Sequence, residues 1–308
     1  MNIGVIDEII RIRLSQVLIN EAYKAGSFKI PIHLSFGHEA IAVAVSSILK
    51  SQDKLLLTHR NMAYNLARAG KLKPILDEYL LNEKGIANAK LGSMNLVNLE
   101  ANIIYSSSIL ANNFSVSAGI AMADKLKNNQ AVTFVLGGDG SMEEGTFYES
   151  LVMMKSLSLS VVVIIENNEW SLGTHITERR TPIDLKKLTE SIGIKYIKLE
   201  NNNTESYIKI LQQAREKSLQ MNEPVCIEVI LKTLGDRRNA PTPEYIEGKY
   251  INYHAGPSLT VDVSSDFHGA LLKDNVDDPV YVILQEIGIE KLKILTSTIF
   301  AQLKTELI

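Results

Sequence analysis

The chain contains little cysteine, and Cys226 is the only one in its 308 residues. A single cysteine excludes an intramolecular disulfide and a metal cluster built from several thiolates. Because Cys226 lies within the apolar run at residues 225–231, we expect it to be a buried core residue.

An excess of charge of one sign and long apolar runs are also missing. The 32 basic and 35 acidic residues give a formal net charge of −3, which provides no general attraction to nucleic acid or to an anionic membrane. No apolar run reaches the roughly 18 residues that a membrane-spanning helix requires, and no charged segment followed by an apolar one opens the sequence. We therefore expect a cytoplasmic protein without a nucleic-acid or membrane partner.

The composition that remains is that of an ordinary globular protein. Apolar residues make up 45% of the chain and charged residues 22%, and the sequence shows no internal repeat and no low-complexity segment. A chain of this length can bury a large core as one α/β domain or as two small ones.

Two apolar runs, at residues 131–136 and 161–165, each end in a polar turn. A helix that begins near Ser141 or Met142 is expected between them, which makes the segment a βαβ unit with parallel strands. Both polar turns then fall at the carboxyl ends of the strands, where open α/β sheets bind ligands.

The residues in these turns suit a divalent cation that carries a diphosphate. Gly138 and Gly140 flank the carboxylate of Asp139, so the backbone can turn sharply and approach an anion while the carboxylate faces a cation. The helix that follows offers free N–H groups to phosphate oxygens. The amide of Asn168 and the backbone carbonyl of Trp170 add neutral oxygens, and such an all-oxygen set suits Mg²⁺.

The spacing of these turns resembles the fingerprint of thiamine-diphosphate enzymes: Gly-Asp-Gly, then residues 141–166, then the Asn167-Asn168 pair. In that family the aspartate and the second asparagine bind the metal that holds the diphosphate. The resemblance therefore implies Mg²⁺ ligands at Asp139, Asn168 and Trp170. It implies cofactor contacts at Gly138, Asp139, Gly140, Ser141 and Asn168.

Two earlier stretches, HLSFGHEAIAVAVSSILK at residues 33–50 and THRNMAYNLARAG at residues 58–70, resemble the α-subunits of 2-oxo acid dehydrogenase first components. In that family a GQEA segment precedes a YRxH-like segment whose arginine reaches the cofactor diphosphate. The resemblance places Arg60 on that arginine and His59 on the aromatic residue before it. The second stretch is predicted to be a helix capped by Thr58 and ended by Gly70.

The middle of the chain follows the same family with changes. Ser108 and Leu110 fall where the family uses main-chain groups to hold the aminopyrimidine ring, so the resemblance implies contacts there. Asn95 replaces the histidine of the family's GSMH segment, which puts the substrate role of that position in doubt.

The loop at residues 231–257 departs from the dehydrogenases, which usually carry an RxHGHS segment there. Lys232-Thr233, Glu247-Gly248 and Tyr253-His254 resemble instead the corresponding loop of transketolases. In transketolases that histidine lies beside the reacting thiazolium carbon. The resemblance implies a catalytic role for His254 as a proton donor or substrate ligand.

The expected fold is α/β, a doubly wound and mostly parallel sheet with helices on both faces. We expect a single thiamine-diphosphate-binding domain, residues 1–308, with an N-terminal helical flank at 1–30, an α/β core at 31–257 and a C-terminal helical extension at 258–308. Further strands are expected at 196–199 and 225–231, and further helices at 3–26, 184–191 and 204–220. An apolar stripe in the C-terminal extension predicts packing on the domain or on a partner subunit: Ile289, Leu292, Leu295, Ile299 and Leu303.

The resemblance also implies what the chain does not carry. In these families a separate α/β unit supplies the glutamate that activates the cofactor, and this chain has length for one unit only. We therefore expect a β-type partner chain in an α₂β₂ assembly.

Three functions follow from the resemblance. The first is decarboxylation of a 2-oxo acid, with a lipoyl carrier as the expected acyl acceptor. The second is ketol transfer between sugars by a split transketolase, and the third is a non-catalytic cofactor-binding subunit. The retained Asp139 and Asn168 argue against the third, and the identity of the substrate stays open.

Overall fold

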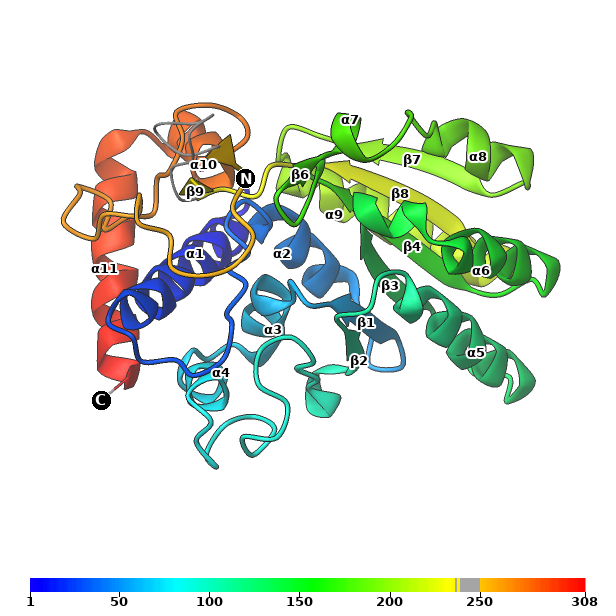
Figure 1. Cartoon of the computed structure of the whole chain (residues 1–308), viewed down its shortest axis with the longest axis horizontal. Helices are drawn as coiled ribbons and strands as arrows, with labels where there is room; N and C mark the ends of the chain where they lie inside the picture. Colours follow the sequence, from blue (N-terminus) through cyan, green and yellow to red (C-terminus); the bar gives the residue numbers. More distant parts are fainter. Residues whose placement is uncertain (236, 239–249, 308) are drawn as a thin grey trace, which may run out of the picture.

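A parallel sheet forms the centre of the molecule in a computed structural model, which describes residues 1–235, 237–238 and 250–307. Within these residues the sheet has six strands in the order β2-β1-β3-β4-β8-β7, and every neighbouring pair is parallel (Figure 1). The strands are β1 Lys54–Thr58, β2 Ile103–Ser107, β3 Thr133–Gly138, β4 Val161–Asn167, β7 Lys195–Leu199 and β8 Val225–Ile230.

Helices cover both faces of this sheet. One layer packs α5, α6 and α8 against it, and the opposite layer contains α2 and α9, with α1, α3, α10 and α11 further out (Figure 1). The longer helices are α1 Ile3–Lys24, α2 Glu39–Ile48, α3 Met62–Ala69, α5 Asn112–Leu126, α6 Gly145–Ser156, α9 Thr204–Met221, α10 Pro279–Ile287 and α11 Ile289–Leu307. The short elements are α4 Lys73–Tyr79, α8 Leu185–Ser191, η1 Leu99–Ala101, η2 Asp139–Glu143, α7 Ile176–Arg179 and the two-residue strands β5 Trp170–Ser171, β6 Thr174–His175, β9 Arg237–Arg238 and β10 Tyr250–Ile251.

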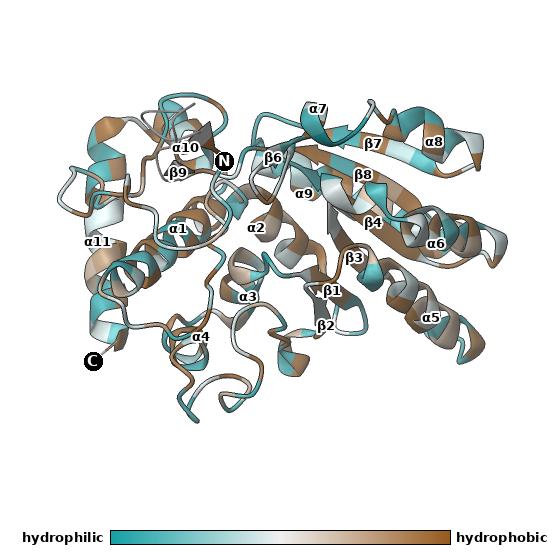
Figure 2. Cartoon of the chain, in the orientation of Figure 1, coloured by the Kyte–Doolittle hydropathy of each residue, from teal (hydrophilic) through white to brown (hydrophobic). Residues whose placement is uncertain are grey.

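Successive side chains of a strand point to opposite faces of the sheet, so the hydrophobic core has one part on each face. Leu55 and Leu57 join the cluster that includes α2 and α9, whereas Leu56 joins the cluster under α5 and α6. A strand that is buried on both faces needs a continuous apolar run, and the central strands are coloured as hydrophobic in Figure 2. Cys226 on β8 is buried, as expected. The predicted doubly wound α/β fold is confirmed.

The C-terminal extension packs within the chain. Helix α11 contacts α1, and Leu292, Ile299 and Leu303 of its apolar stripe are buried in the same core cluster. The first residue of the stripe, Ile289, is not buried, since its side chain is 51% exposed. Within the described part of the chain, every helix is too short or too polar to span a bilayer.

The prediction for residues 58–70 was wrong at its start. Thr58 is the last residue of β1, and helix α3 begins at Met62 with Asn61 as its N-cap. The predicted end is confirmed, because Gly70 caps the helix in the left-handed conformation. Strands β1 and β2 were not expected from the sequence, since each offers only five residues and the apolar part of each is shorter still.

The turn after β3 also differs from expectation. Strand β3 extends to Gly138, and the residues from Asp139 to Glu143 form the 3-10 turn η2. Helix α6 begins only at Gly145, so it does not start at Ser141 or Met142 as predicted. The tight turn keeps Asp139 at the sheet edge and moves the helix away from it.

Candidate functional site

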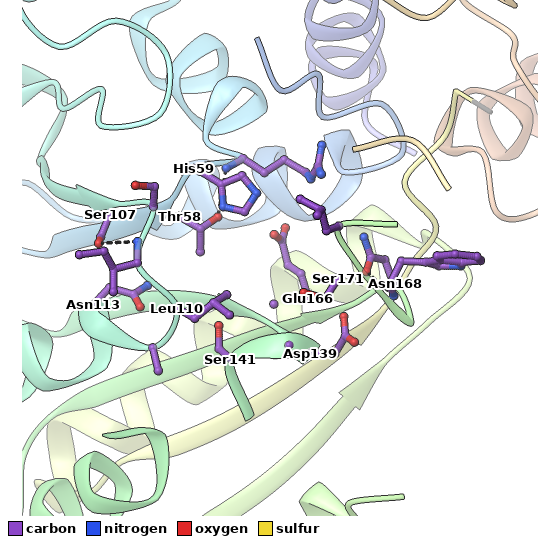
Figure 3. Close-up of a pocket in the computed structure, with 18 of the residues that line it drawn as sticks. Thr58, His59, Ser107, Leu110, Asn113, Asp139, Ser141, Glu166, Asn168 and Ser171 are labelled. Carbon is purple, nitrogen blue, oxygen red and sulfur yellow. Dashed lines mark hydrogen bonds between the residues drawn. The ribbon is translucent and has the colours of Figure 1, made fainter. Parts of the chain in front are cut away.

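A cavity lies at the carboxyl ends of β1, β2, β3 and β4 (Figure 3). Thr58, Ser107 and Gly138, which end three of these strands, belong to its lining. The structure brings all of the predicted site residues together in this lining: His59, Arg60, Ser108, Leu110, Gly138, Asp139, Gly140, Ser141, Asn168, Trp170 and His254. Their individual roles stay predictions, but they share one site.

Asp139 carries a buried oxygen that faces this site without a partner. Its side chain is 1% exposed, and its Oδ2 accepts from Nη2 of Arg179 at 2.5 Å. Within the described residues its Oδ1 has no hydrogen-bond partner. Burial raises the pKa of the Asp139 carboxyl above its ordinary value, although the charge of Arg179 opposes the shift. A buried, unsatisfied carboxylate oxygen at a cavity wall is suited to a cation.

Asn168 reaches the same cavity from the neighbouring strand. Because Gly138 of β3 pairs in register with Glu166 of β4, the turns that follow the two strands lie side by side, as Figure 3 shows for Asp139 and Asn168. The amide nitrogen of Asn168 donates to Oγ1 of Thr233 at 2.7 Å, and its Oδ1 accepts from the Trp170 backbone N–H at 3.0 Å. A carboxylate and an amide oxygen on adjacent turns fit the oxygen preference of Mg²⁺.

Three histidines lie together at the cavity, and His59 and His254 belong to its lining. The ring centroid of His33 lies 4.8 Å from that of His59 and 5.0 Å from that of His254. Burial and the charge of Arg60 lower the pKa of His33 to about 2 and that of His59 to about 3. Neutral imidazoles can both donate and accept hydrogen bonds, so these side chains can contact polar groups of a ligand without adding charge.

Arg60 directly follows His59 and lines the same cavity. It is 8% exposed, its Nη1 donates to the carbonyl of Leu34 at 2.7 Å, and burial lowers its pKa. The remaining guanidinium N–H groups keep a positive charge in the wall of the cavity. A buried arginine at this place is suited to a diphosphate oxygen, as the resemblance implies.

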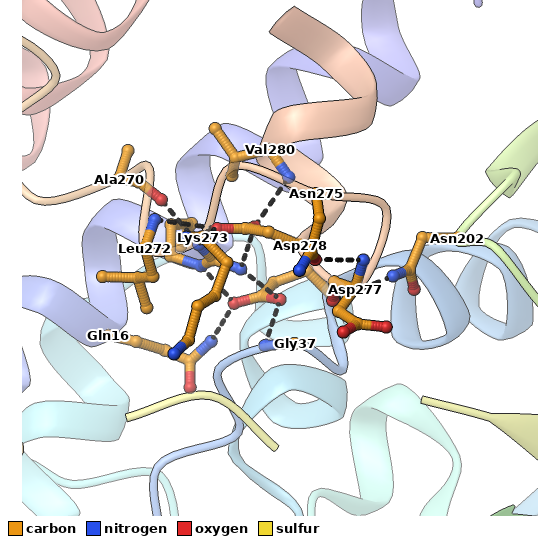
Figure 4. A network of polar contacts seen from close by, with 12 residues as sticks. Gln16, Gly37, Asn202, Ala270, Leu272, Lys273, Asn275, Asp277, Asp278 and Val280 are labelled. Atoms are coloured by element: carbon orange, nitrogen blue, oxygen red, sulfur yellow. Dashed lines mark hydrogen bonds and ion pairs between the residues drawn. The ribbon is translucent and has the colours of Figure 1, made fainter. Parts of the chain in front are cut away.

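The loop that carries His38 is held close to the segment after β8. Gly37 has φ +92°, and a Cβ at this position would lie 2.0 Å from the carbonyl oxygen of Lys232. The Gly37 N–H donates to Oε2 of Glu39 at 2.8 Å, and Glu39 pairs with the fully buried Arg13 at 2.7 Å. Figure 4 shows this polar network around Gly37, where Gln16 Nε2 also donates to Glu39. The network fixes the backbone from which His33 and His38 project.

Several site residues were not expected from the sequence. His33, His38 and Glu166 were missed, although His38 lies inside the GHEA segment and Glu166 directly precedes the Asn167-Asn168 pair. Asn95, whose role was in doubt, is exposed and lies outside the cavity lining. The predicted Glu247-Gly248 segment lies outside the described residues.

Comparison with known proteins places most of the chain in one family. The sequence model described as "Dehydrogenase E1 component" matches residues 12–232. The alpha subunit of the pyruvate dehydrogenase E1 component from Rickettsia prowazekii (strain Madrid E) is 31% identical over 206 residues, which are 67% of this chain and 62% of the relative. The corresponding mitochondrial subunit of Saccharomyces cerevisiae is 31% identical over 167 residues, which are 54% of this chain and 39% of the relative.

A further relative gives a longer match at lower identity. The alpha subunit from Rhizobium meliloti (strain 1021) is 25% identical over 223 residues, which are 72% of this chain and 64% of that protein. The chain thus spans about two thirds or less of the length of the curated relatives it matches.

Proposed function

Because the chain belongs to the dehydrogenase E1 component family, we propose that it is the α-type subunit of a thiamine-diphosphate-dependent 2-oxo acid dehydrogenase. Its task is to anchor the cofactor diphosphate through Mg²⁺. The observation that carries the proposal is the buried Oδ1 of Asp139, which lines the cavity and has no partner among the described residues.

The residues present fit the magnesium diphosphate. Asp139 would bind Mg²⁺ through Oδ1, because its Oδ2 is already paired with Arg179. Asn168 would bind through its amide oxygen and Trp170 through its backbone carbonyl, which gives the all-oxygen set that Mg²⁺ prefers. Ser141, Gly138 and Gly140 line the cavity beside Asp139 and would face the phosphates.

Two further contacts would hold the cofactor. Arg60 and His59 would also meet the diphosphate, and main-chain groups of Ser108 and Leu110 would hold the aminopyrimidine ring. When bound, thiamine diphosphate supplies the carbanion equivalent and electron sink that decarboxylation of a 2-oxo acid requires. The chain itself contributes binding, orientation and exclusion of water, with His254 placed to donate a proton or hold the substrate.

The reaction needs a second chain in this proposal. A β-type partner would supply the activating glutamate in an α₂β₂ assembly, and a lipoyl carrier would accept the acyl group. The described residues form one six-stranded sheet, beside two small two-stranded ones, and the anchoring residues lie at its carboxyl edge, which supports a division of the active site between two chains.

Ketol transfer between sugars remains as a competing outcome because of one observation. His254, from the transketolase-like loop, lies with its ring centroid 5.5 Å from that of His59 in the cavity. The comparisons give this reading no support, and the family match ends at residue 232, where that loop begins. A non-catalytic cofactor-binding subunit is the third outcome.

The test is to co-express the chain with its candidate partner and to assay two reactions in parallel. We expect carbon dioxide release and dye reduction with a 2-oxo acid, and no two-carbon transfer from a ketose phosphate. Asp139→Asn should abolish Mg²⁺-dependent cofactor binding and activity. Glu144→Gln is the matched control, because Glu144 is exposed and makes no capping hydrogen bond at α6.

Each outcome decides between the three functions. Sugar exchange without gas release would favour the transferase. Cofactor binding without either reaction would favour the non-catalytic subunit. Unchanged binding in Asp139→Asn would contradict the proposed anchoring site.

A further inference from the structure

A chain of buried polar groups lies along the wall of the cavity and ends at Asn168. The Tyr64 hydroxyl donates to Oε1 of Glu166 at 2.7 Å. Nδ1 of His38 lies 3.1 Å from the same oxygen as a charge contact, without the alignment of a hydrogen bond among the described residues. Nε2 of His38 lies 2.9 Å from Oγ1 of Thr233, which accepts from Nδ2 of Asn168 at 2.7 Å. Every member before Asn168 is at most 5% exposed, so water cannot replace these partners.

The donors and acceptors of this chain fix its direction. The carboxylate of Glu166, 3.1 Å from Nδ1 of His38, attracts the positive end of an N–H dipole, so we place the hydrogen of the imidazole on Nδ1. In a neutral imidazole the other nitrogen is then an acceptor, and the single hydroxyl hydrogen of Thr233 points to it. Thr233 has no further hydrogen for the amide, so it can only accept from Asn168.

This direction of the hydrogen bonds determines how the side-chain amide of Asn168 is oriented. The NH₂ group of Asn168 must face Thr233, and its oxygen must turn the other way, toward the side where the Trp170 N–H meets it. Figure 3 shows Asn168 and Glu166 at the same cavity wall. A flipped amide would present two N–H groups to a cation, which repels it.

We propose that His38, held by Glu166, acts through Thr233 as a positioning residue that keeps the amide oxygen of Asn168 directed at the metal. This inference rests on the proposed function, since it names the device that orients one of its metal ligands. Mg²⁺ demands near-ideal octahedral geometry, and partners behind metal ligands are what fix such geometry.

The residue at position 38 gives a direct way to examine the relay. His38 stands where the GQEA segment of the dehydrogenase α-subunits has glutamine. A glutamine amide can donate to Glu166 through its nitrogen and accept from Thr233 through its oxygen, which is the same direction as in the imidazole. His38→Gln should therefore preserve the relay, whereas His38→Leu should interrupt it.

The binding experiment uses the full chain with its partner and titrates thiamine diphosphate at graded Mg²⁺ concentrations. Thr233→Val keeps the side-chain shape and removes the hydroxyl, so we expect roughly 10–100-fold weaker apparent Mg²⁺ affinity. High Mg²⁺ should restore cofactor binding in this variant. Thr233→Ser and His38→Gln should bind as the wild type does, and His38→Leu should behave like Thr233→Val.

A second measurement does not depend on binding. Nitrogen-15 NMR of histidine-labelled chain, with the His38 signals identified by their loss in His38→Gln, should show the hydrogen on Nδ1. A hydrogen on Nε2, or wild-type Mg²⁺ affinity in a folded Thr233→Val, would overturn the relay. If a variant at one of the two positions, His38 or Thr233, fails to fold, the tautomer of His38 and the variant at the other position still test the relay.

Asp139→Asn separates failure of the relay from failure of the proposed function. If Asp139→Asn abolishes Mg²⁺-dependent binding and Thr233→Val does not weaken it, the relay alone is wrong. If the wild type shows no Mg²⁺-dependent binding, both the proposed function and the metal-directed role of the relay are wrong.

Discussion

At the scale of single residues, the histidines at the cavity should make the stability of the chain sensitive to acid. The pKa values of His33 and His59 are lowered to about 2 and about 3, whereas an unfolded chain has histidines near 6.5. Below about pH 6.5 the unfolded state binds protons that the folded state does not. Stability is therefore fully present above that pH and falls as the pH falls, by up to about 1.4 kcal/mol per pH unit for each histidine.

The measurement is denaturant unfolding of the cofactor-free chain between pH 8 and pH 4. His59→Tyr retains an aromatic ring and removes one titrating group, so its free energy of unfolding should fall less steeply below pH 6.5. The wild-type and variant curves should run parallel from pH 8 to pH 7, which serves as the control. Parallel curves down to pH 4 would contradict the buried, neutral state of His59.

The residues that the sequence predicted and missed differ in a physical way. Asp139 and Asn168 were predictable because the glycines and the spacing around them constrain one local chemistry. Glu166 and His38 were missed because the role of each depends on its contact with the other. They lie 128 positions apart in the chain, so no local sequence pattern indicates that contact. A buried carboxylate at the end of an apolar strand was the only local signal.

At the scale of elements, Gly37 allows the loop before α2 to pack closely against the segment after β8. A side chain at Gly37 would meet the Lys232 carbonyl at 2.0 Å in addition to the strain of a left-handed backbone. Gly70 also has a positive φ, of +66°, but a Cβ there would meet nothing within 4 Å. Comparing the two glycines therefore separates the effect of backbone strain, which both share, from the effect of the close contact with Lys232, which only Gly37 makes.

Gly37→Ala should therefore destabilise the chain more than Gly70→Ala. The backbone strain alone costs about 1–3 kcal/mol at either position, and the clash at Gly37 adds to it. Gly37→Ala should also weaken Mg²⁺-dependent cofactor binding, because it separates His38 from Thr233. Denaturant unfolding measures the first effect and cofactor titration the second. Equal losses of stability in the two variants would contradict the close approach.

The elements themselves show where sequence patterns are informative. Helix α9 and strand β4 were predicted within one or two residues because each is long and bounded by a cap or a turn. Strands β1 and β2 were missed because five-residue strands in a sheet buried on both faces carry no alternation. The start of α6 was misplaced because the 3-10 turn η2 has the same residue preferences as a first helical turn.

At the scale of the whole molecule, segments that are far apart in the sequence meet at one cavity. The carboxyl ends of β1 to β4 supply its floor, while the segments around His38 and His254, far apart in sequence, close its side. The C-terminal helices do not line the cavity but pack on α1. The proposed function requires that this chain bind a metal and share it with a cofactor.

The most direct test is anomalous diffraction from crystals of the chain with its partner, thiamine diphosphate and Mn²⁺, which accepts the same octahedral oxygen ligands as Mg²⁺. We expect one Mn²⁺ peak about 2.1 Å from both Oδ1 of Asp139 and Oδ1 of Asn168. A peak among His33, His59 and His254 instead, or a bound cofactor with no metal at Asp139, would contradict the proposed metal site.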